Sequence, residues 1–238
     1  MRRMLLLVLA SLFAIALWAS DPWKDKSYKD WDQKDVRQIM NESPWAKKIE
    51  IKGPGGLEAP EGAPTAGGAP GANEEKEGPG GEEDEENEKG EVTFIVRWIS
   101  SRTLREASAR SQVLQGRISQ AEIEKHIPPE PDDYQLVVVG TNMMIFQKTD
   151  ESALQSKSYL AAKKSKQKIA PSQVEIVRTR EGKKIGAIVF HFPKKTKSGD
   201  PMIADDEKEL NFVARAGTVE IKTGFDPQKM VDKQGKDL

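Results

Sequence analysis

The sequence of 238 residues contains no cysteine and only two histidines, and aromatic residues make up 6% of it. Without cysteine, no disulfide and no thiolate metal site can form, so stability must come from a packed core. No serine stands in a G-x-S-x-G context, which leaves little basis for Ser-His-Asp catalysis. A zinc site needs three or four ligands, and neither histidine has a ligand partner beside it. We therefore predict no catalytic residues, no metal site and no cofactor.

The two histidines fit structural roles. His191 alternates with Ile185, Ala187 and Val189 along one expected strand face, where a hydrogen-bonded structural histidine is more common than a catalytic base. His126 lies in the last turn of an expected helix, where a positive or polar side chain complements the helix dipole. We expect neither histidine to act in catalysis.

Beyond residue 20 the sequence has no apolar run long enough to cross a bilayer. In the first twenty residues, Arg2 and Arg3 precede an apolar run over residues 4–13, and Ala14-Ile15-Ala16 offers a small-x-small cleavage site. This order is typical of a bacterial export signal. We predict that residues 1–20 are a signal peptide, cleaved after Ala16 or at a later site, and that the protein is periplasmic or secreted. An uncleaved anchor is the alternative, although the 16 residues 4–19 fall short of the roughly 20 that a spanning helix needs.

Residues 53–90 have the composition of a linker. They contain 11 of the 19 glycines, 5 of the 14 prolines, 11 acidic residues and 2 lysines. Such a stretch cannot bury enough apolar surface to offset its ordering entropy, so we predict a disordered, low-complexity acidic linker. The acidic run 82–88 is most simply a solubilising spacer; binding a cation or shielding a basic partner face is the alternative.

Residues 21–52, before this linker, hold three of the five tryptophans. Asp32 can cap a helix over residues 33–42, and Pro44 ends this helix. The negative charge of Asp35 in its first turn stabilises the positive end of the helix dipole. One short helix cannot bury three indoles, so this Trp-rich helical segment needs a partner surface. We predict that it docks on the chain's own C-terminal domain, and an exposed recognition peptide is the alternative. The candidate docking residues are Trp23, Trp31, Val36, Ile39, Met40 and Trp45.

Residues 91–238 have the pattern of one globular domain. The sequence predicts strands over residues 91–100 and 134–140, and helices over 102–115, from Ser119 onward, and over 150–164. Two hairpins are expected near the C-terminus, pairing 174–180 with 184–192 and 209–215 with 218–223. Because strands and helices do not alternate regularly, we predict an α+β fold with a mainly antiparallel sheet and two to three helices.

Charged residues provide two candidate clusters in this domain. Asp200, Asp205, Asp206 and Glu207 lie between expected strands, where we expect a solvated loop, with a Ca²⁺ site as the alternative. Basic residues outnumber acidic ones by 25 to 20 over residues 91–238 and gather around the first hairpin. A positive face could hold an anionic polymer or lipid headgroups; without interleaved aromatics, nucleic acid is a poor fit. A solvated lysine surface, balanced by the acidic linker, is the simpler interpretation. The candidate basic face consists of Arg178, Arg180, Lys183, Lys184, Lys194, Lys195 and Lys197.

Several segments resemble, in the same order, an uncharacterised family of predicted exported bacterial proteins. They are WDQKDVRQIMNESPWAKKI, FIVRWISSRTLREA, YQLVVVG, IVFHFP and KMVDKQGKDL, and the W-x4-V-x2-I-x3-SPWAK element is the most specific. The match covers residues 21–52 and most of 91–238. The resemblance implies secretion, but no known activity and no catalytic residue to carry over. Lys229, Lys233 and Lys236 stand where a more apolar ending is expected, which argues against a final strand.

The sequence thus predicts an exported, non-enzymatic interaction or structural protein of the bacterial envelope, with an envelope protein or an anionic polymer as partner. An exported hydrolase with paired carboxylates is the alternative, because acids that are distant in sequence can meet in space. A cavity lined by converging acids would favour the hydrolase, and a domain without one would favour binding.

Overall fold

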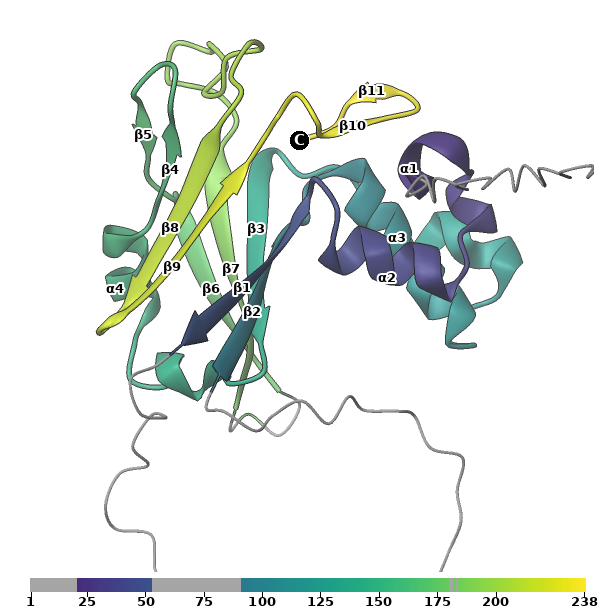
Figure 1. The fold of residues 1–238 in the computed structure, drawn as a ribbon, viewed down its shortest axis with the longest axis horizontal. Coiled ribbons are helices and arrows are strands. Elements are labelled where there is room, and N and C mark those ends of the chain that lie inside the picture. The colour runs from purple at the N-terminus through teal and green to yellow at the C-terminus, as the bar shows by residue number, and fades with distance from the viewer. Residues whose placement is uncertain (1–20, 53–90, 180–181, 183) are drawn as a thin grey trace, which may run out of the picture.

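The computed structural model describes residues 21–52, 91–179, 182 and 184–238. The predicted signal peptide and linker lie outside the described residues. The described chain forms two antiparallel sheets that face each other, with a group of helices beside the larger sheet (Figure 1). The predicted α+β class with a mainly antiparallel sheet is confirmed.

The larger sheet has five strands in the order β1-β2-β3-β7-β6, and every neighbouring pair is antiparallel. Its strands are β1 (Ala46–Lys52), β2 (Glu91–Trp98), β3 (Asp133–Gly140), β6 (Gln173–Arg178) and β7 (Ile185–Pro193). The sequence analysis did not predict β1, whose Lys48 and Glu50 interrupt its apolar residues. Lys52 pairs with Glu91. Lys52 and Glu91, which flank residues 53–90, are therefore cross-strand neighbours.

The second sheet has four strands in the order β5-β4-β8-β9. They are β4 (Tyr159–Ala162), β5 (Lys168–Ile169), β8 (Leu210–Ala216) and β9 (Val219–Phe225); β10 (Val231–Asp232) and β11 (Gly235–Lys236) form a separate small hairpin. The predicted helix over residues 150–164 is wrong in its second half, since α4 (Glu151–Lys157) is followed by β4. Leu160 pairs with Phe212 and is fully buried. Pairing with a residue 52 positions away overrides the local helical pattern.

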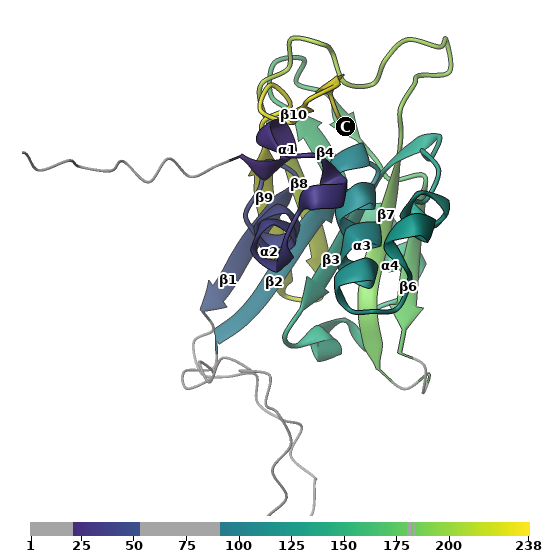
Figure 2. The same cartoon turned by 90° about the vertical axis from the view of Figure 1, so that its right-hand side faces the viewer.

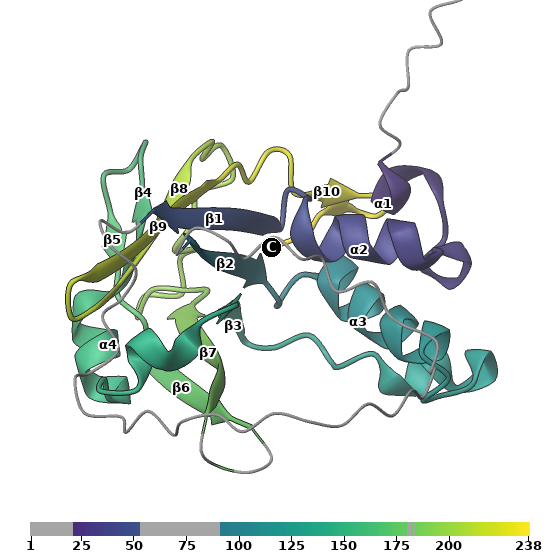
Figure 3. The same cartoon turned by 60° about the horizontal axis from the view of Figure 1, so that its bottom comes forward.

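Aromatic side chains join the two sheets. The Phe190 and Phe212 rings lie 5.1 Å apart, and those of Trp98 and Phe225 lie 5.4 Å apart, each pair with one ring from each sheet. Figure 3 shows β1 beside β8 and β9, so the two sheets also approach each other at this edge. The main hydrophobic core therefore fills the space between the sheets.

The helices gather mainly on the other side of the larger sheet, where α2 and α3 lie in front of it in Figure 2. The α-helices are α1 (Pro22–Asp25), α2 (Gln33–Asn41), α3 (Arg102–Leu114) and α4; the 3-10 helices are η1 (Tyr28–Asp30), η2 (Gln120–His126) and η3 (Met143–Phe146). The expected cap of α2 is confirmed, because the Asp32 carboxylate accepts a hydrogen bond of 2.8 Å from the Asp35 amide. The helix expected from Ser119 is instead the 3-10 helix η2, and the Ser119 hydroxyl donates to the Glu122 carboxylate.

Candidate functional site

The tryptophans of the N-terminal segment lie in the protein's own core. Trp23, Trp31 and Trp45 are buried, and Trp45 is fully inaccessible. The Trp23 and Trp45 rings meet edge to face at 5.6 Å, and the Trp31 indole donates to the Pro22 carbonyl at 3.0 Å. The remaining docking candidates come from α2: Val36 and Ile39 are buried, and Met40 is partly exposed. These side chains serve the fold, so none except Met40 offers a surface to a partner.

The described residues of the candidate basic face do not come together. Arg180 and Lys183 lie outside the described residues. Lys184 precedes β7 and Lys194 follows it, and a nine-residue strand separates its ends by about 30 Å. Lys194 also pairs with Glu130 at 2.7 Å. The hairpin therefore places Arg178 and Lys184 at one end of the molecule and Lys194, Lys195 and Lys197 at the other.

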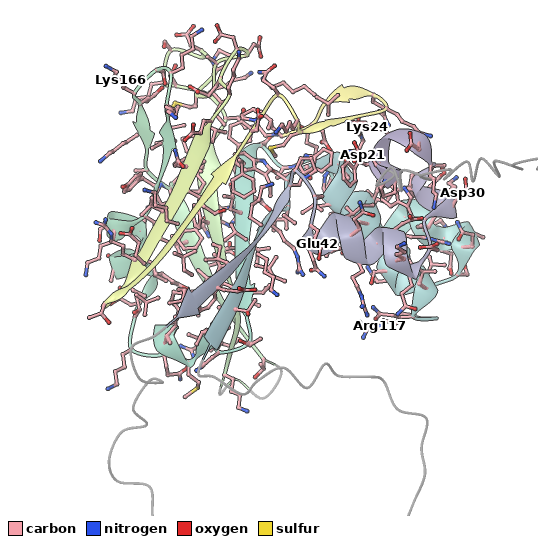
Figure 4. The ribbon with its side chains drawn as sticks, viewed as in Figure 1. Asp21, Lys24, Asp30, Glu42, Arg117 and Lys166 are labelled. Atoms are coloured by element: carbon pink, nitrogen blue, oxygen red, sulfur yellow. The ribbon has the colours of Figure 1, made fainter. Side chains whose placement is uncertain are left out.

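Other cations are scattered as well. Figure 4 places Lys166 beside the β4–β5 hairpin and Arg117 at the far end of the helical group. Near Lys166, Lys163 pairs with Glu209 at 2.6 Å, and Lys164 pairs with Asp206. The described structure thus presents cations that are dispersed or neutralised by neighbouring acids, which is typical of a solvated surface.

The acidic cluster between β7 and β8 has a structural role at Glu207, which is 1% exposed although a solvated loop was expected. Its carboxylate accepts hydrogen bonds from the backbone amides of Lys164 at 3.1 Å and Ser165 at 3.4 Å. It therefore holds the turn between β4 and β5. Within the described ranges, no group of three or more His, Asp or Glu side chains is placed to hold a metal ion.

His191 lies on the outer face of the larger sheet. Its Nδ1 lies 2.6 Å from the Asp133 carboxylate, and its buried Nε2 lies 3.4 Å from the Glu175 carboxylate but forms no hydrogen bond among the described residues. We expected Ile185 to lie on the same strand face as His191, and this is wrong. The pairing of β6 with β7 shifts register between Val177 and Arg178, so the Ile185 side chain lies in the core instead. The hydroxyl of nearby Ser172 is bonded to the His191 carbonyl. The Ser172 hydroxyl is therefore not placed as a nucleophile for the pair formed by His191 and Asp133.

A polar cavity of about 290 Å³ lies near the C-terminus, between the start of α3 and the ends of β2 and β7. Its lining includes the acids Glu130, Asp205 and Asp237, so it bears on the hydrolase alternative. Ion pairing with Lys194 lowers the pKa of Glu130. Asp237 accepts hydrogen bonds from the Arg102 amide and from the amide and hydroxyl of Thr103, at 2.6 to 2.9 Å. A catalytic general acid needs a raised pKa and a carboxyl group that is free to donate its proton to the substrate. Neither Glu130 nor Asp237 has this environment. The cavity gives the hydrolase little support.

A second cavity, of about 430 Å³, lies between the helices and the outer face of the larger sheet. We call it the helix–sheet groove. Its walls come from the end of α2, strands β2 and β3, the start of α3 and the proline-rich loop before β3. Its lining residues are Met40, Arg97, Ile99, Leu104, Arg105, Ser108, Pro128, Pro129, Pro131, Gln135 and Val137. The lining is mostly apolar, and this size and character are usual for sites that bind small molecules.

The groove contains two arginines and no acidic residue. Arg97 donates from Nε to the Met40 carbonyl at 2.6 Å and from Nη2 to the Asn41 side chain at 3.0 Å. Arg105 donates to the carbonyls of Ser100 at 3.2 Å and Pro128 at 2.8 Å. All four acceptors are neutral. Burial lowers the pKa of the Arg97 guanidinium, because its charged form is partly desolvated.

Sequence reasoning missed this groove. It placed Pro128, Pro129 and Pro131 in no site, and it named Met40 only as a docking residue. The one available signal was Arg97, a cation within the otherwise apolar strand pattern EVTFIVRWIS. A lone arginine in a strand indicates a polar partner on that face, but it cannot name the segments that meet it.

All helices in the described part of the chain are too short or too polar to span a lipid bilayer. The resemblance to exported bacterial proteins stays a prediction. No protein-family model, curated protein or solved structure matches this chain.

Proposed function

We propose that this is an exported, non-enzymatic binding protein of the bacterial envelope, and that the helix–sheet groove holds a small apolar molecule. The observation that carries the proposal is the groove itself: about 430 Å³ of mostly apolar space, bounded by both the sheet and the helices. We propose this groove instead of the basic face, because the fold brings the lining residues of the groove together.

The walls of the groove are fixed before any ligand arrives. Leu104 and Val137 are buried on its floor. The start of α3 is held by the Ser101 side chain, which accepts from the Leu104 amide, and by the Asp237 carboxylate. The proline-rich loop has three residues whose φ angles are set by their rings. A preformed site loses less entropy on binding, which favours a binding function.

Binding is also better supported than catalysis by the chemistry of the described side chains. The acids of the polar cavity are paired or hydrogen-bonded, and His191 faces carboxylates rather than a serine nucleophile. Export is supported by the order of Arg2, Arg3, the apolar run 4–13 and Ala14-Ile15-Ala16. We therefore propose that the ligand comes from the bacterial envelope.

Calorimetric titration of the purified protein with 1-octanol and with octanoate tests the proposal. Ser108 is exposed on α3 and lines the groove, so Ser108→Trp should fill the groove without disturbing the core. Gln115→Trp places the same side chain at the exposed end of α3, outside the groove, and serves as the control. We expect saturable binding that Ser108→Trp abolishes and Gln115→Trp retains. If neither compound binds, or if Ser108→Trp binds both as the wild type does, the proposal is wrong.

A further inference from the structure

We infer that the ligand of the helix–sheet groove carries a carboxylate, which pairs with Arg97 and Arg105 while its apolar body lies against Met40, Ile99 and Val137. The inference rests on the proposed function and names the class of ligand. It concerns a small molecule with an apolar chain and one carboxylate.

Arg97 supplies the first argument. It stands on the outer face of β2, partly buried, with Ala46 and Val137 as its cross-strand neighbours. Its two hydrogen bonds to Met40 and Asn41 fix the guanidinium against the C-terminal end of α2. Within the described residues, no hydrogen bond involves its Nη1 and no carboxylate forms an ion pair with it. A partly buried charge without an opposite charge is costly, and a ligand carboxylate would offset that cost.

Arg105 supplies the second argument by contrast with Arg102, three positions earlier on the same helix. Arg102 forms a bidentate pair with the Asp232 carboxylate, at 2.8 and 2.7 Å. Within the described residues, Arg105 donates only to backbone carbonyls, and the nearby Glu130 accepts a hydrogen bond from Lys194. The fold therefore gives a carboxylate to Arg102, which does not line the groove. Among the described residues, no carboxylate pairs with the two arginines that do.

The chemistry of the ligand follows from these walls. A planar guanidinium recognises a carboxylate through two parallel hydrogen bonds. With two cations and no acid in the lining, an ammonium ligand would meet repulsion and an uncharged one would leave the arginines unpaired. The rest of the molecule should be mainly apolar, because apart from Ser108 and Gln135 the remaining lining residues offer no hydrogen-bonding side chain. A medium-chain fatty acid and the free C-terminus of a short apolar peptide both meet this description.

Titrations with three compounds of equal chain length separate head group from chain. We expect octanoate to bind at least about tenfold more tightly than 1-octanol, and octylamine not to bind, because a hydrogen bond to a charged group contributes about 1.5 to 3 kcal/mol. N-acetyl-Leu-Leu, compared with its C-terminal amide, tests the peptide source. If octanol binds as tightly as octanoate, the carboxylate inference is wrong while the apolar groove stands. If none of these compounds binds, the proposed function fails as well.

Variants of arginine test which residue holds the carboxylate. We expect Arg97→Gln to weaken octanoate binding by about 10- to 100-fold and octanol binding by less than about twofold. Arg105→Gln is a second variant, for use if Arg97→Gln does not fold, and should also weaken octanoate selectively. Arg117→Gln makes the same change at an exposed position far from the groove (Figure 4) and should have no effect. Equal loss of octanoate and octanol binding in both groove variants would show a structural role and overturn the inference.

Discussion

The indole Nε1 of Trp45 donates a hydrogen bond of 2.6 Å to the backbone carbonyl of Asp237, across 192 positions of sequence. The Trp45 carbonyl accepts a hydrogen bond of 2.8 Å from the Trp98 amide, and the Asp237 carboxylate holds the first amides of α3. Trp45 thus joins the N-terminal segment, the larger sheet and the C-terminal residues. Side chains of the segment 21–52 are therefore part of the core. The Trp45 contacts help to hold α2, which belongs to this segment, beside the groove.

Trp45→Phe should keep most of the buried apolar area but leave the Asp237 carbonyl without its donor. We expect the free energy of unfolding to fall by about 1 to 3 kcal/mol, since an unsatisfied buried acceptor costs that amount. Trp45→Ala should cost about 3 to 5 kcal/mol, because it also opens a cavity. Urea unfolding followed by circular dichroism measures both. Wild-type unfolding midpoints for both variants would contradict this role of Trp45.

Gly140 at the end of β3 has no room for a side chain. A β-carbon there would lie 2.5 Å from Cδ1 of the fully buried Phe94 and 2.8 Å from the Thr93 carbonyl oxygen. We expect Gly140→Ala to destabilise the protein by about 1 to 3 kcal/mol through overpacking. Gly186→Ala on β7 is the matched control, because its nearest neighbour would be 3.7 Å away. Equal thermal stability of the two variants would rule out this close packing.

Glu106 on α3 should make stability depend on pH. The pKa of Glu106 is raised from 4.5 to about 7, mainly by burial; the charges of Arg102 and Arg105 act to lower it, and those of Asp232 and Asp237 act to raise it. Between these values the folded state keeps a proton that the unfolded state has lost, so stability falls as pH rises from 4.5 to about 7 and the loss persists above that. Allowing for its partial exposure, we expect a loss of about 1 to 3 kcal/mol.

Glu106→Gln should therefore remove this contribution to the pH dependence, and at about pH 8 the variant should be the more stable protein by about 1 to 3 kcal/mol. Glu42→Gln changes an exposed carboxylate after the end of α2 (Figure 4) and provides the control. Urea midpoints measured from about pH 5 to pH 8 would show the effect. Parallel pH profiles for the wild type and Glu106→Gln would show that Glu106 is not perturbed as described.

Local signals in the sequence were enough to predict some helix ends and turns. The Asp32 cap specifies the start of α2, and Gly217, with a φ of 58°, permits the tight turn between β8 and β9. The end of α4 could not be predicted in this way, because β4 exists through pairing with β8 and α4 through its own cap. The same holds for the groove. Met40, Arg97 and Pro128 belong to three separate segments, so only the fold brings them together.

Export makes a prediction about the mature N-terminus. If residues 1–20 direct export and signal peptidase cuts after Ala16, the secreted or periplasmic form should begin at Leu17. N-terminal sequencing of protein recovered from the envelope fraction measures this. Ala16→Leu should block cleavage at that site, because only small residues are accepted there. Recovery of wild-type protein that still begins at Met1 would support an uncleaved anchor instead.

The central claim is that the helix–sheet groove binds an apolar carboxylate through Arg97. A crystal structure with 8-bromooctanoate, recorded at the bromine absorption edge, tests it most directly. We predict an anomalous bromine peak inside the groove near Met40 and Val137, with the carboxylate about 3 Å from the Arg97 guanidinium. A bromine peak elsewhere on the protein, or a ligand whose carboxylate points to solvent away from Arg97, would contradict the account.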